Sequence, residues 1–393
     1  MSDFRAQADA MLAQLIAWRR DFHQHPELGF QETRTSSIVA RHLHDLGIEV
    51  QQGVGRTGVV GIVDGAGDGP TVLLRFDMDA LPIQEISDAP YRSQHAGVMH
   101  ACGHDGHTAI GLGVATLLSR QRQRLAGRVK LVFQPAEEGL GGAMAMIRDG
   151  VLQQPAPDFA FGLHLWNQFA FGQAAVQAGP LLAAADEFRL TVTGRGSHGA
   201  MPHEGIDAIV AAAQVVTALQ TVVSRSIDPT QTAVLTIGTV HGGQAFNVLA
   251  GDVTMTGTVR TFDAAVRQQV WQSIETIGRS VCQAYGAGFT LEQIGCAAPA
   301  TVNHPRPTET MRQAAQTLTD VVQVTQVKPL MIAEDMSEFL QRVPGCFALL
   351  GAGPHPHPHH NAGFDFDERA LPVGVALLCE TAARVLSQPV NPG

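Results

Sequence analysis

The sequence is poor in cysteine and in aromatic residues, and it contains no run of basic residues. Its five cysteines are scattered without a Cys-x-x-Cys pair, so we expect reduced thiols in a reducing compartment. Acidic residues outnumber basic ones by 36 to 26, which gives a formal net charge of −10. A surface that neutralises phosphates is therefore disfavoured, and we expect neither a nucleic-acid partner nor a membrane partner.

A long hydrophobic run is also missing. The longest stretch without Asp, Glu, Lys or Arg covers residues 159–185, but asparagine, glutamine, glycine and proline interrupt it, so it does not fit a spanning helix. The first residues carry Asp3, Arg5 and Asp9 and lack the apolar segment of a secretory signal. These absences predict a cytoplasmic protein.

The signatures of several enzyme classes are absent or stand in the wrong context. There is no phosphate-loop lysine and no Gly-x-Ser-x-Gly, so phosphoryl transfer and serine hydrolysis lack their usual motifs. Residues 53–58 match Gly-x-Gly-x-x-Gly, but residues 59–63 are predicted to form a strand rather than a helix. Without a helix N-terminus to bind a pyrophosphate, we expect no dinucleotide site.

The chain is long and hydrophobic enough for a large α/β domain with an insertion. It has 393 residues, of which 45% are hydrophobic. Residues 1–185 and 297–393 alternate helical and strand patterns, as expected of a mostly parallel sheet covered by helices. Helices are predicted at 6–22, 32–46, after 106, after 139, at 308–318 and at 368–386, and strands at 58–63, 71–76, 129–133, 158–165 and 346–351.

The pattern changes within residues 186–296. Strands are predicted at 187–193, 233–240, 253–261 and 289–294, and helices at 206–223 and 264–285. In chain order these elements form βαββαβ, the ferredoxin-like unit. The sequence therefore predicts one domain of residues 1–185 and 297–393, interrupted by a compact inserted domain of residues 186–296.

Residues 99–107 hold the first concentration of reactive side chains in a chain with seventeen histidines. Cys102 and His104 stand two residues apart in a glycine-containing turn that opens a predicted helix. Thiolate and neutral imidazole both favour zinc-like divalent ions, so the pair predicts a metal chelate. The alternative is a buried cysteine next to a helix-capping turn with incidental histidines.

Further candidate groups follow two other predicted strands. Glu137 and Glu138 come directly after the strand at 129–133, where one carboxylate can bind an ion while the other serves as general base. The alternative is a solvated acidic loop. His164 ends the apolar strand at 158–165, where a lone histidine is more often a core residue. Because ligands in open α/β sheets gather outside the carboxyl ends of strands, we expect all these groups at one edge.

Taken together, the motifs resemble the two-metal aminoacylase and carboxypeptidase family, in the branch of hippurate hydrolases, N-acyl-amino-acid amidohydrolases and plant auxin-conjugate hydrolases. The matching segments follow the family's order along nearly the whole chain. They are residues 19–28, 74–82, 99–107, 133–139, 162–164, 194–202, 257–261, 334–336 and 360–361, followed by 364–368.

The resemblance implies a centre of two divalent metal ions (Zn, Mn, Co or Ni) and a general base. The implied ligands are Cys102, His104, Glu138, His164 and His360. Glu137 would be the base and proton shuttle. His355, His357 and His359 crowd the last ligand and form a possible surface metal-binding tract. Asp77 and Asp79 would either orient a ligand or cap a loop.

The resemblance also assigns roles within the inserted domain, which would be a lid that forms a homodimer. His198 would reach a neighbouring active site and steady the oxyanion. Asn247 and Arg260 would hold the substrate carboxylate. The family usually has Asn-Val-Ile-Pro where this chain has Asn-Val-Leu-Ala at residues 247–250.

The implied function is metal-dependent hydrolysis of the amide bond in N-acyl-amino acids, of the hippurate or N-acetyl type. Glu137 would take a proton from the attacking water and return it to the leaving amine. A dipeptidase or carboxypeptidase with the same centre is the alternative enzyme. A non-catalytic metal-binding protein is the alternative from another class, but it would have no need of Glu137.

Overall fold

The structure, a computed structural model, describes residues 4–387 and divides the chain into two compact units. One unit, here called the sheet unit, combines the residues up to Leu181 with Val302–Lys328 and the residues from Asp335 onward. The other, the inserted unit, comprises Leu182–Thr301 and Pro329–Glu334. Each unit has its own hydrophobic core.

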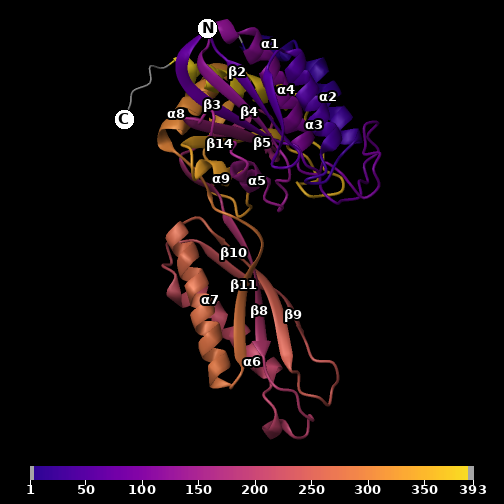
Figure 1. The fold of residues 1–393 in the computed structure, drawn as a ribbon, viewed down its shortest axis with the longest axis vertical. Coiled ribbons are helices and arrows are strands. Elements are labelled where there is room, and N and C mark those ends of the chain that lie inside the picture. The colour runs from indigo at the N-terminus through magenta and orange to yellow at the C-terminus, as the bar shows by residue number, and fades with distance from the viewer. Residues whose placement is uncertain (1–3, 388–393) are drawn as a thin grey trace. The chain divides into compact units, whose positions relative to one another are not determined.

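In the described part of the sheet unit, eight strands form one sheet in the order β1-β2-β4-β3-β5-β14-β6-β13 (Figure 1). The four neighbouring strands β4, β3, β5 and β14 are parallel to one another, which confirms the predicted fold class. The strands are β1 Glu49–Val54, β2 Gly58–Asp64, β3 Gly67–Asp77, β4 Ala126–Gln134, β5 Phe159–Ala170, β6 Gln173–Ala175, β13 Gln323–Thr325 and β14 Gly345–Gly353, and a separate pair is formed by β7 Gly179–Leu182 and β12 Thr301–Asn303.

Helices cover this sheet, and two of them lie within the core. Nearly every residue of α4 and α10 is buried, which explains why both sequences are apolar all round. The central strands are likewise buried along most of their length, as expected of a covered parallel sheet. The helices are α1 Phe4–Asp9, α2 Leu12–Gln24, α3 Thr33–Asp45, α4 His104–Arg120, α5 Gly142–Arg148, α8 Pro305–Ala315, α9 Met336–Leu340 and α10 Ala370–Ser387.

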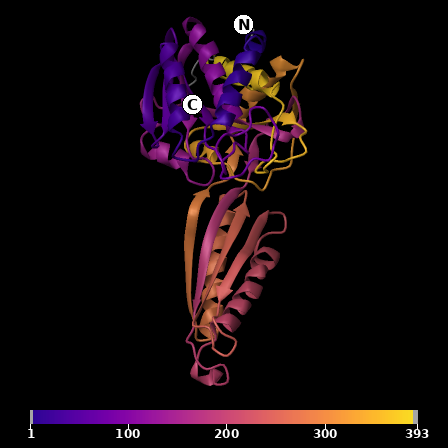
Figure 2. The ribbon, with the colours of Figure 1, turned by 90° about the vertical axis from the view of Figure 1, so that its right-hand side faces the viewer.

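The inserted unit confirms the predicted βαββαβ order. Its four strands form an antiparallel sheet in the order β11-β8-β10-β9. Alternate residues of β8 are buried, because α6 and α7 cover only one face of the sheet (Figure 2). The elements are β8 Ala184–Thr193, α6 Ala208–Thr221, β9 Ala233–Gly242, β10 Asp252–Thr261, α7 Ala264–Ala284 and β11 Gly288–Ala298.

Several local predictions differ from the structure. The helix expected at residues 6–22 is two helices, α1 and α2, separated by Ala10 and Met11. The strands β1, β6, β7, β12 and β13 were not predicted; β1 is mostly exposed, and the other four have only three or four residues. The Gly-x-Gly-x-x-Gly match forms the turn between β1 and β2 and leads into a strand, as predicted.

Close packing of α4 on the sheet gives a stability prediction. A methyl group added at Gly111 would stand 2.5 Å from the ring of Phe133 and 2.7 Å from that of Phe76. Gly111→Ala should therefore lower the free energy of unfolding by about 1–3 kcal/mol, although alanine favours a helix more than glycine does. Urea unfolding followed by circular dichroism measures the change.

The matched control is Gly67→Ala, at the exposed start of β3, where an added methyl group meets nothing within 4 Å. It should change the free energy of unfolding by less than about 0.5 kcal/mol. Equal effects of the two substitutions would contradict the close approach of α4 to the sheet.

Candidate metal centre

The candidate side chains lie at the ends of the central parallel strands. Asp77 is the last residue of β3, and Glu137 and Glu138 follow β4. His164 stands in the middle of β5, which continues to Ala170 beyond the end expected from the sequence, and His360 lies in the loop after β14. Because these strands are parallel, the segments that follow them emerge at one edge of the sheet, as expected from the sequence.

The start of α4 brings the thiol and the first imidazole to the same place. Gly103, with φ of 89°, occupies the position before the helix and turns the chain sharply between Cys102 and His104. His104 is fully buried, and Cys102 is nearly so.

Among the described residues, five groups of side chains place their ligand atoms close enough to share a metal ion, within 4.8 Å of one another. Three of these groups overlap and consist only of residues expected from the sequence. They are Cys102 with His104 and His164; Cys102 with Glu138 and His360; and His104 with Glu137 and Glu138. The structure thus brings together all six residues that the sequence assigned to this centre, while their individual roles remain predictions.

Two buried atoms at the middle of these groups lack a hydrogen-bond partner. They are Nε2 of His104 and Oε1 of Glu138, and they lie 4.0 Å apart. A buried polar atom without a partner costs about 1–3 kcal/mol, so such a pair is rarely left unsatisfied. An imidazole nitrogen and a carboxylate oxygen are both metal ligands, and the donor set fits a divalent cation.

The surrounding hydrogen bonds point the imidazoles toward this place. Nδ1 of His164 donates to the carbonyl of Leu165 at 2.9 Å, which leaves Nε2 facing the thiol of Cys102 at 3.4 Å. Nδ1 of His104 lies 3.2 Å from Asp79, which also accepts the N–H of Glu138 at 2.9 Å. An outer partner of this kind fixes the tautomer and orientation of a metal-binding histidine.

Asp77 joins the centre to a buried arginine. Arg75 donates to Asp77, and its other nitrogens donate to Gln134 at 2.8 Å and Asp335 at 2.9 Å. Asp77 in turn accepts from Nδ1 of His107 at 2.6 Å. Because Nε2 of His107 accepts the N–H of Leu165, both nitrogens of this ring are engaged in hydrogen bonds.

A second buried arginine, Arg19, ties α2 to the start of α4 and to the segment after His360. It donates to Asp105 at 2.8 Å and to Asp365 at 2.8 Å. Asp105 directly follows His104 and also accepts from His23 at 2.7 Å. The guanidinium, although Asp105 is buried, holds the pKa of that carboxyl far below its ordinary value.

The pKa values of two buried groups show that the centre has an excess of negative charge. Burial and the nearby carboxylates of Glu138 and Glu137 raise the pKa of Cys102 well above its ordinary value. Burial alone would lower the pKa of His104, but Asp77, Asp79 and Glu138 raise it to about 10. The carboxylates therefore favour protonation of both groups when no other cation compensates them.

The four histidines between residues 355 and 360 differ in their surroundings. Nε2 of His360 lies 3.4 Å from Oε1 of Glu138, with its side chain 54% exposed. His359 stacks on Trp166, with ring centroids 4.3 Å apart. Within the described residues, His355 and His357 belong to none of the groups that could hold a metal.

The three predicted residues of the inserted unit lie at two ends of its sheet. His198 is in the loop after β8 and Asn247 in the loop before β10; the N–H of Gly199 donates to the carbonyl of Asn247 at 2.7 Å. Arg260 lies near the far end of β10, beside a hollow of about 300 Å³. Nδ1 of His198 accepts the N–H of Ala200, so a neutral ring carries its proton on Nε2.

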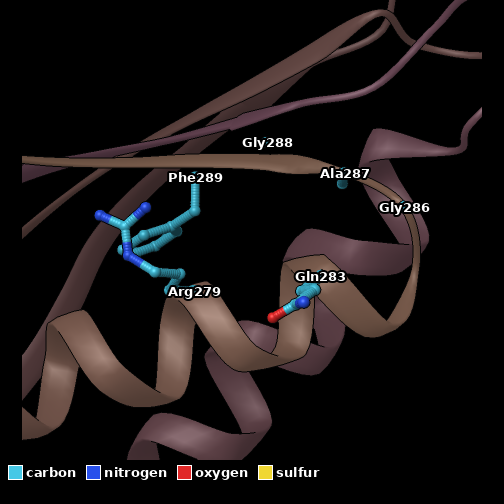
Figure 3. Close-up of a pocket in the computed structure, with 6 residues that line it drawn as sticks. All are labelled: Arg279, Gln283, Gly286, Ala287, Gly288 and Phe289. Atoms are coloured by element: carbon cyan, nitrogen blue, oxygen red, sulfur yellow. The ribbon is translucent and has the colours of Figure 1, made fainter.

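A second hollow in this unit lies away from these residues, between the end of α7 and the start of β11. Its volume is about 430 Å³, and it is lined by Arg279, Gln283 and the segment 286–289. Figure 3 shows Arg279 pointing from α7 toward β11. Its guanidinium is paired with Glu275 on the same helix, so it supplies no free charge.

A family model described as peptidase family M20/M25/M40 matches residues 73–384. This chain belongs to that family. It is thus a hydrolase of amide bonds, and the family resemblance seen in the sequence is confirmed.

Individual members of the family match most of the chain. N-acetyl-L-cysteine deacetylase of Bacillus subtilis is 40% identical over 374 residues, which cover 95% of this chain and 88% of the relative. Thermostable carboxypeptidase 2 of Saccharolobus solfataricus is 42% identical over 340 residues, or 86% and 85% of the two chains. The solved structure of the YXEP protein of Bacillus subtilis, described as a dinuclear metal binding peptidase of the M20 family, has a TM-score of 0.85, 34% identity and coverage of 96% and 99%.

Asp77 and Asp79 were expected from the sequence to orient a ligand or cap a loop, but the sequence did not identify the two arginines that support the centre of this M20 chain. Arg75 is 2% exposed although it lies in the apolar strand β3, and Arg19 is fully buried in α2. A charged residue within an apolar buried strand requires a partner, and that was the available signal for Arg75. The partner Asp335 is distant in sequence and could not be identified from spacing.

The raised pKa of Cys102 gives a prediction for the metal-free enzyme. Because the thiolate is the reactive form, iodoacetamide should modify Cys102 at pH 8.5 at least about tenfold more slowly than it modifies the exposed Cys296. The rate at Cys102 should still rise with pH beyond 9.0, its ordinary pKa. Mass spectrometry of the labelled peptides gives both rates, and equal rates at the two cysteines would contradict the interpretation.

Proposed function

We propose that this enzyme hydrolyses the amide bond of N-acyl-amino acids at a centre of two divalent cations. The ligands are Cys102, His104, Glu138, His164 and His360. The observation that carries this proposal is that two buried atoms without a hydrogen-bond partner, His104 Nε2 and Glu138 Oε1, lie together inside a group of thiol, imidazole and carboxylate side chains. A family relative described as a dinuclear metal binding peptidase supports the number of ions.

The donor set suits Zn, Mn, Co or Ni, because it combines thiolate, imidazole and carboxylate. When bound, such ions act as Lewis acids that polarise the amide carbonyl and lower the pKa of water. The protein supplies the fixed donors, and Asp79 and Leu165 keep the imidazoles of His104 and His164 oriented. Binding of a cation also favours the thiolate of Cys102 over the thiol.

Glu137 is the proton shuttle in this proposal. Its Oε1 accepts the N–H of Asp335 at 3.3 Å, and Asp335 is held by Arg75, so the carboxylate has a defined place beside Glu138. It removes a proton from the attacking water and gives it to the leaving nitrogen. A carboxylate that serves in both directions needs this fixed position but not a place in the ligand set.

The substrate class rests on the relatives. One is described as an N-acetyl-L-cysteine deacetylase and another, of Arabidopsis thaliana, as an IAA-amino acid hydrolase. A relative described as a carboxypeptidase favours the second candidate, hydrolysis of a peptide bond at the same centre. Values of kcat/KM for N-acetyl-, N-benzoyl- and dipeptide substrates with one shared amino acid separate the two activities.

A second copy of the chain is the proposed partner, through the inserted unit. The outward face of α6 exposes Ile209 by 48% and Val210 by 45%, and the edge strand β9 exposes Val240 by 56%. By length and composition, residues 208–226 are apolar enough to cross a membrane. Only 33% of the most hydrophobic 18-residue window in this segment is buried against the rest of the chain, so much apolar surface stays uncovered. A homodimer covers this face, and the five free cysteines support a cytoplasmic location.

The inserted sheet determines which residues can act together. Asp252 pairs with Thr193 at one end of β10, and Arg260 pairs with Ala185 near the other. Eight residues at about 3.3 Å each separate these positions by roughly 26 Å. His198 and Asn247 of one copy therefore cannot meet its own Arg260 on a single small substrate. We propose that one site takes His198 and Asn247 from one copy of the chain and Arg260 from the other copy.

The roles of the adjacent glutamates give the first functional prediction. Glu137→Gln should keep the metal content near two ions per chain but lower kcat by about 10²- to 10⁴-fold, because only the proton transfer is lost. Glu138→Ala and Cys102→Ala should lose metal as well as activity. Elemental analysis of dialysed protein and steady-state kinetics measure both effects. Metal loss in Glu137→Gln with retention in Glu138→Ala would reverse the assignment.

The division of work between two copies gives the second functional prediction. His198→Ala and Arg260→Ala should each lower kcat/KM. The loss in His198→Ala should correspond to about 3 kcal/mol of transition-state stabilisation, because an oxyanion donor is removed. Mixing these two variants after subunit exchange should restore activity in one of the two sites of the mixed dimer.

The matched control mixes His198→Ala with Asn247→Ala, which should restore nothing, because both residues come from the same copy. Recovery in this control, or none with Arg260→Ala, would refute the proposed division. A native mass spectrum verifies that mixed dimers have formed in each sample.

A further inference from the structure

His360 differs from the other proposed ligands in how it is held. It lies in a loop, its side chain is 54% exposed, and its backbone has a φ of 63°. A residue other than glycine in this left-handed region is strained and persists only where its surroundings hold it. The loop must therefore be fixed by something outside itself for His360 to face Glu138.

The side chain of Asn167 supplies such a constraint. It is fully buried near the end of β5, three residues after His164. Its amide nitrogen donates to the carbonyl of His357 at 2.8 Å and to the carbonyl of Asp365 at 2.9 Å. These two carbonyls lie on opposite sides of His360 in the sequence, so one amide group closes the base of the loop.

Backbone contacts extend the attachment. The carbonyl of Asn167 accepts the N–H of His355 at 2.9 Å. The N–H of His360 donates to the carbonyl of Ala101 at 2.8 Å, next to Cys102. The loop is therefore joined to the two segments that carry the buried donors His164 and Cys102.

We infer that Asn167 is a positioning residue that fixes His360 for binding of the second cation. This inference rests on the proposed function, because it takes His360 as a ligand. An amide nitrogen has two N–H groups and meets two carbonyl acceptors here, which a carboxylate of the same shape cannot do. Asn167 has no other part in the proposed reaction.

The test replaces Asn167 with aspartate and measures binding of Co²⁺ to the metal-free, full-length enzyme. The second equivalent of Co²⁺ should bind about 10- to 100-fold more weakly, the usual effect of losing an outer partner of a ligand. The first equivalent, held with His104 and His164, should keep its thiolate-to-cobalt absorption band. Calorimetric titration and visible absorption give these two readouts without an activity assay.

Gln51→Glu is the matched control, since it makes the same chemical change at an exposed side chain of β1. It should bind both equivalents as the wild type does. If Asn167→Asp does not fold by circular dichroism, Asn167→Ser replaces it; the hydroxyl keeps one donor, and the affinity loss should be smaller.

A double-mutant cycle distinguishes positioning from general support of the fold. In a His360→Ala background, Asn167→Asp should change the affinity for Co²⁺ by less than about twofold, because the residue through which it acts is gone. An equal loss with and without His360, or no loss in the single variant, would overturn the inference. If His360→Ala by itself leaves both equivalents tightly bound, the ligand assignment in the proposed function fails instead, and the inference falls with it.

Discussion

The centre depends on the negative charge of the buried side chain of Asp77. Burial opposes that charge, but Arg75, His104 and His107 outweigh it and hold the pKa of this carboxyl well below its ordinary value. Removing one partner of a buried ion pair leaves the other charged and unsatisfied, which is strongly destabilising. Asp77 therefore has to remain with its partners, and this requirement fixes β3, β4 and the first turn of α4 relative to one another.

The fixed positions of these elements also place the other candidate metal ligands. The parallel strands end at one edge, so short loops suffice to bring a thiol, imidazoles and carboxylates within a few ångströms. This arrangement concentrates carboxylates around His104 and Cys102, which raises the pKa of both groups. A bound cation offsets the repulsion among these negative charges, so its binding is coupled to the stability of the folded sheet unit.

The inserted unit follows a different principle. Its sheet has helices on one face only, and its two ends carry different candidate residues. Because β-strands are extended, residues eight positions apart on β10 cannot contact the same small molecule, whatever their side-chain rotamers. The exposed apolar face of α6 and the separation of His198 from Arg260 lead to the same proposal, a second copy of the chain.

The sequence by itself determined the fold class and the βαββαβ insertion, because these depend on periodicity. Local motifs such as Cys102-Gly103-His104, together with the family resemblance, predicted the residues of the centre. Periodicity missed the break between α1 and α2, since the apolar pattern continues across Ala10 and Met11. Only the tertiary structure decided that Arg75 pairs with Asp335 and that Asn167 binds the His360 loop. Those contacts join segments distant in sequence, or polar groups whose partners are backbone carbonyls, and such carbonyls have no sequence signature.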